Sequence, residues 1–347
     1  MKKIIVFISL ILSLILASCS GKEQLIDNYK DTWNFVATTD SVTPSLMLVQ
    51  MPGDSVINGD VFLSANGEAL SGKVQRIVEF QNLLYLFIPS KYIIVVISST
   101  DFKRVATIDF SASGMEPSDI CFPNATTAFV AHGKDTSVSV VDITVFKVAR
   151  TIKVGLNPVS ITCSGNQIYV ANRGDNTISI LDSRDNSQKT VIPVSAAPSY
   201  VDMTSDGTKL IVISLGAGKL GGTEQKTAAT VSIIDTASKA VEKTIDMGYT
   251  TTSSVDQLPR GLTVTGIDWA YVPCTDNVLD FDARFGNQMF LAMPGNYFNV
   301  LYNPKRNELL MVQETDSGDE LQVIDPDQGG ILSRYSFTKK VNLVLPL

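Results

Sequence analysis

Short segments in which apolar and polar residues alternate run along most of the chain. Residues 168–171 (IYVA) and 177–182 (TISILD) are typical, and Gly, Pro, Asn and Asp bound segments of this kind. A period of two places alternate side chains on opposite faces of a strand, so the pattern predicts short β-strands. No stretch after residue 30 shows a convincing amphipathic helix period, and we therefore expect an all-β fold.

The alternating segments belong to a repeated unit. Each copy has a starting anchor, a short strand, a turn, a second strand, a polar loop, a third strand ending near Asp, and a last strand. The anchors are Val74, Pro117, Pro158, Pro198, Pro259 and Tyr297; four of the five intervals are 38 to 43 residues and one is 61. Four strands in about 40 residues is the period of a β-propeller blade.

A partial copy at residues 45–63 brings the expected number of four-stranded antiparallel blades to seven. This copy has no clear first strand, because residues 46–50 match the second strand of the other units. The C-terminal segment 340–346 is apolar and falls where another first strand is due. We therefore predict that 340–346 is the innermost strand of a blade whose other strands lie within 45–72, which closes the ring.

Two stretches resemble a known repeat family. Residues 169–172 (YVAN) with 176–182 (NTISILD) look like the YVTN-type β-propeller repeat, and residues 129–131 (FVA) with 137–142 (SVSVVD) are a second match. Residues 60–72 resemble a segment of propeller lipoproteins of Bacteroidetes. The resemblance covers residues 45–337, weakens in the last blades, and is specific for the fold rather than for the function.

The N-terminus has the features of a targeting segment. Lys2 and Lys3 precede an apolar run from Ile4 to Ala17, which is too short to span a bilayer and suits a signal peptide. The run ends in Leu-Ala-Ser-Cys at Cys19, which resembles the bacterial lipobox, although an ordinary signal peptide is the alternative. We predict a lipoprotein signal peptide at 1–18, a tether at 19–32 and a propeller at 33–347.

Acylation of Cys19 implies a cell-envelope protein held in a lipid bilayer, because several buried acyl chains anchor stably. By resemblance to Gram-negative sorting rules, the serine after Cys19 favours the outer membrane. We expect the propeller to be exposed at the cell surface, and the sequence leaves a periplasmic orientation open.

Composition narrows the function. Apolar residues make up 44% and charged residues 18%, which suits a packed core, and the net charge of −7 argues against a nucleic-acid partner. The chain has a single histidine, His132, and Cys121, Cys163 and Cys274 lack metal-ligand spacing. We predict no metal, no cofactor and no catalytic residue, and interpret the three cysteines as small buried side chains.

Two insertions point to one working face. In a propeller, the loops between the second and third strands and those between blades share a face, and residues 216–227 and 249–258 both belong there. The position two residues after each anchor forms either a polar ring at the mouth of the axial channel or a solvated lining; it holds Arg76, Asp119, Ser160, Tyr200, Gly261 and Asn299. The candidate ligand-binding residues are Arg76, Tyr200, Tyr249, Arg260, Tyr297, His132 and Arg173.

Three functions fit these patterns. The first is non-enzymatic capture of a small molecule or glycan. The most specific version of this function is capture of a corrinoid, because propeller lipoproteins of the Bacteroidetes type include some that capture cobalamin beside an outer-membrane transporter. The second is an interaction scaffold for an envelope protein such as an outer-membrane transporter. The third is a lactonase- or lyase-like propeller enzyme, which the shortage of histidine disfavours. A concave mouth lined by aromatic side chains favours the first function, and a flat face favours the second.

Overall fold

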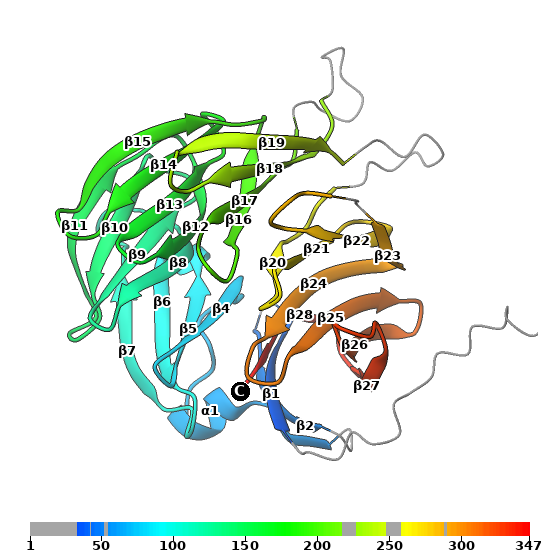
Figure 1. Cartoon of the computed structure of the whole chain (residues 1–347). Helices are drawn as coiled ribbons and strands as arrows, with labels where there is room; N and C mark the ends of the chain where they lie inside the picture. The colour runs from blue at the N-terminus through cyan, green and yellow to red at the C-terminus, as the bar shows by residue number, and fades with distance from the viewer. Residues whose placement is uncertain (1–32, 42, 52–54, 217–226, 248–257, 288–289) are drawn as a thin grey trace, which may run out of the picture.

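The computed structural model describes residues 33–347 except 42, 52–54, 217–226, 248–257 and 288–289. Seven four-stranded antiparallel sheets stand around a central axis as the blades of a β-propeller (Figure 1). The predicted fold class is therefore confirmed. The predicted signal peptide, Cys19 and the tether lie outside the described residues. No helix in the described part of the chain is long and apolar enough to cross a membrane.

Six blades follow the chain in order, each running from an inner to an outer strand. Their strands are β4 (Arg76–Phe80), β5 (Leu83–Ile88), β6 (Ile93–Ser98) and β7 (Arg104–Asp109); β8 (Pro117–Asn124), β9 (Thr127–His132), β10 (Ser137–Asp142) and β11 (Lys147–Lys153); β12 (Pro158–Ser164), β13 (Gln167–Asn172), β14 (Thr177–Asp182) and β15 (Ser187–Pro193); β16 (Pro198–Met203), β17 (Lys209–Ser214), β18 (Thr230–Asp235) and β19 (Ala240–Asp246); β20 (Thr263–Val264), β21 (Trp269–Pro273), β22 (Asn277–Asp282) and β23 (Phe290–Pro294); and β24 (Asn296–Asn303), β25 (Glu308–Thr315), β26 (Gly318–Ile324) and β27 (Ile331–Ser336).

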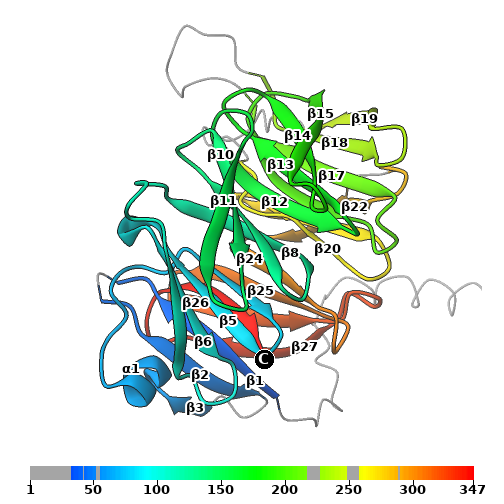
Figure 2. The ribbon, with the colours of Figure 1, turned by 90° about the vertical axis from the view of Figure 1, so that its left-hand side faces the viewer.

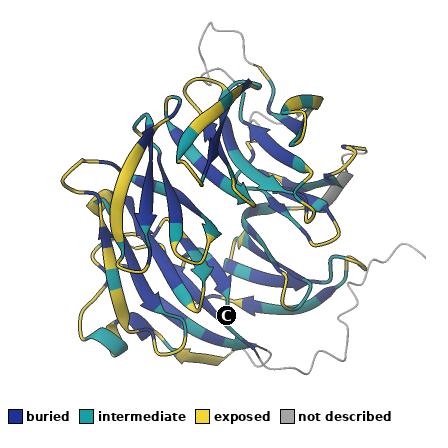
Figure 3. Cartoon of the chain, turned by 60° about the vertical axis from the view of Figure 1, so that its left-hand side comes forward, coloured by how far each residue is buried: buried dark blue, intermediate teal, exposed yellow. Residues whose placement is uncertain are grey.

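Burial changes from the middle of each blade to its rim (Figure 3). The second strand β13 is buried along almost its whole length, whereas the outer strand β11 is exposed except at Ile152. Middle strands have a neighbouring blade on each face, so their side chains enter apolar clusters between blades. One cluster joins Phe129 and Val138 to Ile161 and Ile168 of the next blade. The core thus lies between sheets and holds the ring together.

The seventh, closing blade joins the two ends of the propeller. Its order is β28 (Val341–Pro346), β1 (Trp33–Thr39), β2 (Leu46–Met51) and β3 (Ser55–Asn58), with β28 innermost. β28 runs antiparallel to β1, and Ala37 faces Val344 in the register. The predicted closure by 340–346 is confirmed.

Two details of this region were predicted wrongly. Residues 46–50 form the third strand, because β1 lies between β28 and β2. β1 escapes detection because its neighbours bury both of its faces, including Thr38 and Thr39, so no clean alternation marks it. The blade thus begins at residue 33, outside the expected 45–72.

A short helix also replaces part of the expected all-β pattern. α1 (Val61–Asn66) links β3 to β4 and lies against β2 of the closing blade (Figure 2). The Asp60 side chain caps it by accepting a hydrogen bond from the Leu63 amide at 3.1 Å, and Gly67 ends it in the left-handed region. Six residues are too few to display a helical period, so this helix was not predicted.

Polar side chains link the inner strands to one another. Asp119 on β8 accepts a hydrogen bond from the Ile161 amide of β12 at 3.0 Å, and Asp202 on β16 accepts one from the Val264 amide of β20 at 2.9 Å. In the same way, Ser160 accepts from the Val201 amide and Thr263 accepts from the Tyr302 amide, whereas the Asn342 side chain donates to the Val74 carbonyl. These bonds fix the inner strands around the axis, where the first residues of several strands form a cavity.

Candidate functional site

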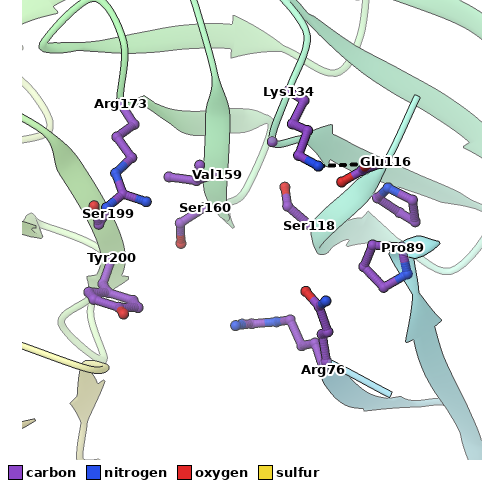
Figure 4. A pocket seen from close by; sticks show the side chains of 13 residues that line it. Arg76, Pro89, Glu116, Ser118, Lys134, Val159, Ser160, Arg173, Ser199 and Tyr200 are labelled. Atoms are coloured by element: carbon purple, nitrogen blue, oxygen red, sulfur yellow. Dashed lines mark hydrogen bonds and ion pairs between the residues drawn. The ribbon is translucent and has the colours of Figure 1, made fainter. Parts of the chain in front are cut away.

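A cavity of about 300 Å³ opens where four consecutive inner strands begin (Figure 4). We call it the mouth cavity; its lining residues are Gln75, Arg76, Pro89, Glu116, Pro117, Ser118, Gly133, Lys134, Val159, Ser160, Arg173, Ser199 and Tyr200. They come from the starts of β4, β8, β12 and β16, from loops between second and third strands, and from the loop entering β8. By their place in the repeat, the two predicted insertions belong to loops of this same face.

The predicted ring two residues after each anchor contributes to this cavity in part. Arg76, Ser160 and Tyr200 line it. Asp119 lies buried behind them and is not part of the lining, and neither are Gly261 and Asn299. The ring position thus faces the cavity on only one side of the axis.

Arg76 is fixed at the base of the mouth cavity by a buried carboxylate. Its Nε lies 2.7 Å from Oδ1 of Asp119, whose side chain is only 2% exposed, whereas the Arg76 side chain is 46% exposed. Burial raises the pKa of Asp119, and the Arg76 charge and three hydrogen bonds oppose the shift. The ion pair orients Arg76 and leaves much of its guanidinium free to meet a ligand.

Tyr200 lies within the field of three arginines. Burial raises the pKa of its phenol, and the charges of Arg173, Arg76 and Arg260 work in the opposite direction, so the ring stays neutral at physiological pH. Arg260 donates a hydrogen bond to Oδ1 of Asn296 at 2.6 Å. Tyr200, Arg173 and Arg76 belong to three different blades and line the mouth cavity, whereas Arg260 is not among its lining residues.

Arg173 is the least constrained of these groups. It follows β13 in an exposed loop and points toward the cavity (Figure 4). Among the described residues, no carboxylate lies within ion-pair distance of its guanidinium. The other two cations of the lining are paired, Arg76 with Asp119 at 2.7 Å and Lys134 with Glu116 at 2.9 Å. Arg173 therefore offers the free cationic group of the described lining.

This arrangement suits a small anionic ligand. A guanidinium presents planar donors that match a carboxylate or phosphate, and an adjacent tyrosine supplies an aromatic face. The volume lies at the lower end of the range for small-molecule pockets. No group of His, Cys, Asp or Glu within the described residues could hold a metal ion.

Three further candidate residues, His132, Tyr297 and Arg260, are not among the residues that line this cavity. His132 is fully buried at the end of β9, and its Nε2 lies 2.8 Å from Oγ of Ser139. Asn172 has the same place in the next blade and donates to Oγ of Ser179 at 2.8 Å. Both residues thus tie a second strand to a third strand.

Tyr297 is also buried, and its hydroxyl donates to Oε1 of Gln322 at 3.2 Å. Tyr249 lies outside the described residues, as does most of both insertions. The first insertion starts beside the mouth cavity, because the Gly216 amide donates to the Ala196 carbonyl in the turn that enters β16.

Sequence reasoning missed several lining residues, including Lys134, Glu116 and Gln75. The position directly after each anchor is the feature of the sequence that could have identified part of the lining. Gln75, Ser118, Val159 and Ser199 all occupy that position and all face the cavity. Arg260 has the same place in its own repeat.

No protein-family model matches the chain, and no curated protein matches it in sequence. Many solved structures share its fold. A functionally unknown protein from Desulfotomaculum acetoxidans is 13% identical with a TM-score of 0.66, and the match covers 90% of this chain and 98% of that one.

Two further similar structures belong to named proteins. Hydrazine synthase from Kuenenia stuttgartiensis is 20% identical with a TM-score of 0.61, covering 74% of this chain and 77% of that one. The β-propeller domain of Cps50 (Swd1) from Myceliophteria thermophila is 11% identical with a TM-score of 0.59, covering 77% and 88%. At these identities the likeness defines the class, a seven-bladed β-propeller, and carries no activity across.

Proposed function

We propose that this propeller is a lipid-anchored, non-enzymatic binding module of the outer membrane that captures a small molecule bearing an acidic group. The observation that carries the proposal is that Arg76 and Arg173 line the mouth cavity together with Tyr200. The chain as a whole has a net charge of −7, so a local group of cations is not a general property of its surface.

The proposed ligand has two parts. Its acidic group lies against the guanidinium of Arg173, with Arg76 beside it, and its apolar or sugar ring lies on Tyr200. A corrinoid with a nucleotide tail carries a phosphate, and an acidic glycan carries carboxylates, so both fit this description. Anchoring through acylated Cys19 rests on the lipobox resemblance.

The interaction scaffold is the second candidate, with an outer-membrane transporter as its partner. The concavity of the mouth supports capture over a flat docking face, although Tyr200 is the only aromatic side chain among the described lining residues, where an aromatic lining was expected. An enzymatic role is third. The similarity to hydrazine synthase is one of fold. Among the described residues, no group of His, Cys, Asp or Glu side chains could hold a metal ion for lactonase- or lyase-like chemistry.

Isothermal titration of the purified protein with cobalamin, an acidic oligosaccharide and a neutral oligosaccharide tests the proposal. We expect an acidic ligand to bind, and Arg173→Gln to weaken it about tenfold or more, the loss of one charge-assisted hydrogen bond. Arg150→Gln is the matched control, because Arg150 is an exposed arginine on the outer strand β11. Binding of none of the probes, or equal affinity in wild type and Arg173→Gln, would contradict capture at this cavity.

A further inference from the structure

Two cysteines from neighbouring blades meet inside the ring. Cys121 lies on β8 and Cys163 on β12, the inner strands of adjacent blades. Asp119 hydrogen-bonds to the backbone of β12, and Cys121, two residues further along β8, faces the same way. Ile161 packs against Phe129 of the previous blade, and Cys163, two residues after Ile161, also faces that blade. The strand period alone therefore directs the two thiols toward each other.

The contacts agree with this placement. Cys121 belongs to the apolar cluster between the two blades, and Cys163 packs against that same cluster. The two inner strands also lie close together at their starts, where Oγ of Ser118 on β8 donates to the carbonyl of Pro158 on β12 at 3.1 Å. Two cysteines on neighbouring strands can form a disulfide when their side chains face each other and their Cα atoms lie within about 7 Å.

The two thiols are unequal in a way that suits exchange chemistry. Cys121 is buried, and burial raises its pKa well above the usual value. Cys163 is partly exposed, and the hydrogen bond with Cys121 lowers its pKa. A partly exposed thiol can react first with an external disulfide, and a buried thiol beside it can then displace the adduct, so that a disulfide forms in two steps.

We propose that Cys121 and Cys163 form a reversible disulfide that joins the inner strands of two neighbouring blades. The oxidant is a disulfide, RS–SR. The Cys163 thiolate attacks one of its sulfur atoms and releases RS⁻, which takes the proton of Cys121. The Cys121 thiolate then attacks Sγ of Cys163 and releases the second RS⁻, which takes up the proton that Cys163 gave to solvent. The protein loses two hydrogen atoms, and RS–SR becomes two RSH.

The bond acts on the wall of the mouth cavity. β8 and β12 contribute Ser118 and Ser160 to its lining, so the disulfide fixes the spacing of these two strands. It also closes a loop of about 40 residues, which restricts the unfolded chain. We therefore expect the oxidised protein to melt at a higher temperature than the reduced protein.

Peptide mapping after treatment with oxidised glutathione tests the proposal. The purified protein is reduced, incubated with glutathione disulfide, denatured in an alkylating agent and digested, so that each cysteine is detected separately. We expect a cross-linked peptide pair that contains Cys121 and Cys163, while Cys274 remains alkylated. Cys274 is a matched internal control, because it is buried and burial raises its pKa to about 12.

Three variants separate the steps. Cys121→Ser should stop at a glutathione adduct on Cys163, Cys163→Ser should form no adduct and no cross-link, and Cys274→Ser should behave as wild type, including the rise in melting temperature on oxidation. A lasting glutathione adduct on wild-type Cys163, a bridge to Cys274 or Cys19, or full alkylation of Cys121 and Cys163 after oxidation would overturn the proposal. Mapping of the wild type decides the question by itself if a variant fails to fold.

Discussion

Replacing His132 with asparagine should make the propeller less sensitive to acid. His132 is fully buried, its ring lies edge-on to Phe110 with centroids 4.9 Å apart, and Nε2 is paired with Ser139. Burial lowers the pKa of His132 to about 4, although the charge of Asp135 works in the opposite direction. Asparagine already occupies the matching position in the next blade, Asn172, so the substitution copies a side chain that this fold accepts.

The expected effect follows from proton linkage. Unfolded histidine titrates near pH 6.5. Because the pKa is lower in the folded state, the unfolded chain binds more protons between pH 6.5 and 4, and stability is lost as the pH falls through this range. From pH 7 to pH 5 the loss due to His132 amounts to about 2 kcal/mol, at about 1.4 kcal/mol per pKa unit. His132→Asn should lack this loss.

Urea denaturation at pH 7 and pH 5, followed by tryptophan fluorescence, measures the difference. His132 is the only histidine in the sequence, so no second imidazole contributes. Other groups titrate in both proteins and cancel when wild type and variant are compared. Asn172→His is the reciprocal variant, and it should add an acid-dependent loss of similar size.

Equal losses of stability from pH 7 to pH 5 in wild type and His132→Asn would refute this reasoning. Such a result would mean that His132 takes up a proton in the folded protein as readily as in the unfolded chain. Equal denaturant slopes in the two proteins would show that the comparison concerns the same unfolding transition.

Three further predictions concern other parts of the chain. Burial raises the pKa of Asp202 to about 6, so the contribution of Asp202 to the free energy of unfolding falls as the pH rises from about 4 to 6. The free energy of unfolding of Asp202→Asn should therefore rise by up to about 3 kcal/mol relative to wild type across that range. The same pH dependence of urea denaturation in the two proteins would contradict this. Truncation after Lys339 removes β28 with three buried side chains, Val341, Val344 and Leu345, and should cost about 5 kcal/mol or more, so a chain that melts within a few degrees of the full-length protein would exclude a closing role for β28. Cys19→Ala should move the protein from the membrane fraction to the soluble fraction of lysed cells, and unchanged sedimentation with membranes would contradict lipid anchoring.

The repeat explains why most of the architecture could be predicted. Strand period, turn residues and the spacing of anchors such as Pro117 and Pro158 are local properties, and together they define the blades. The strand at 341–346 was predictable for the same reason, because the first blade lacked an inner strand. β1 was not predictable, because both of its faces are covered by parts of the chain that the sequence does not place beside it.

The candidate site was predicted only in part for a similar reason. Arg76 and Tyr200 stand two residues after an anchor, where the repeat predicts an inner-strand position near the mouth. His132 and Tyr297 have suitable chemistry, but adjacent blades bury them, and burial depends on packing between units rather than on position within a unit. The ion pair of Lys134 with Glu116 joins two different loops, so no pattern within one repeat predicts it.

The pairing of β28 with β1 also sets where the chain enters and leaves the ring. β1 is the second strand of its blade, so its first residue, Trp33, lies on the face opposite the loops that join second to third strands. The other end of the chain lies there too, because the Leu347 amide donates to the Asn34 carbonyl at 3.0 Å. The mouth cavity opens on the opposite face.

This geometry gives the proposed lipid anchor a direction. An anchor at Cys19 connects to the far face through residues 19–32, which can span at most about 50 Å. The proposed anchor therefore attaches to the face opposite the mouth cavity, so the attachment point itself does not cover the mouth.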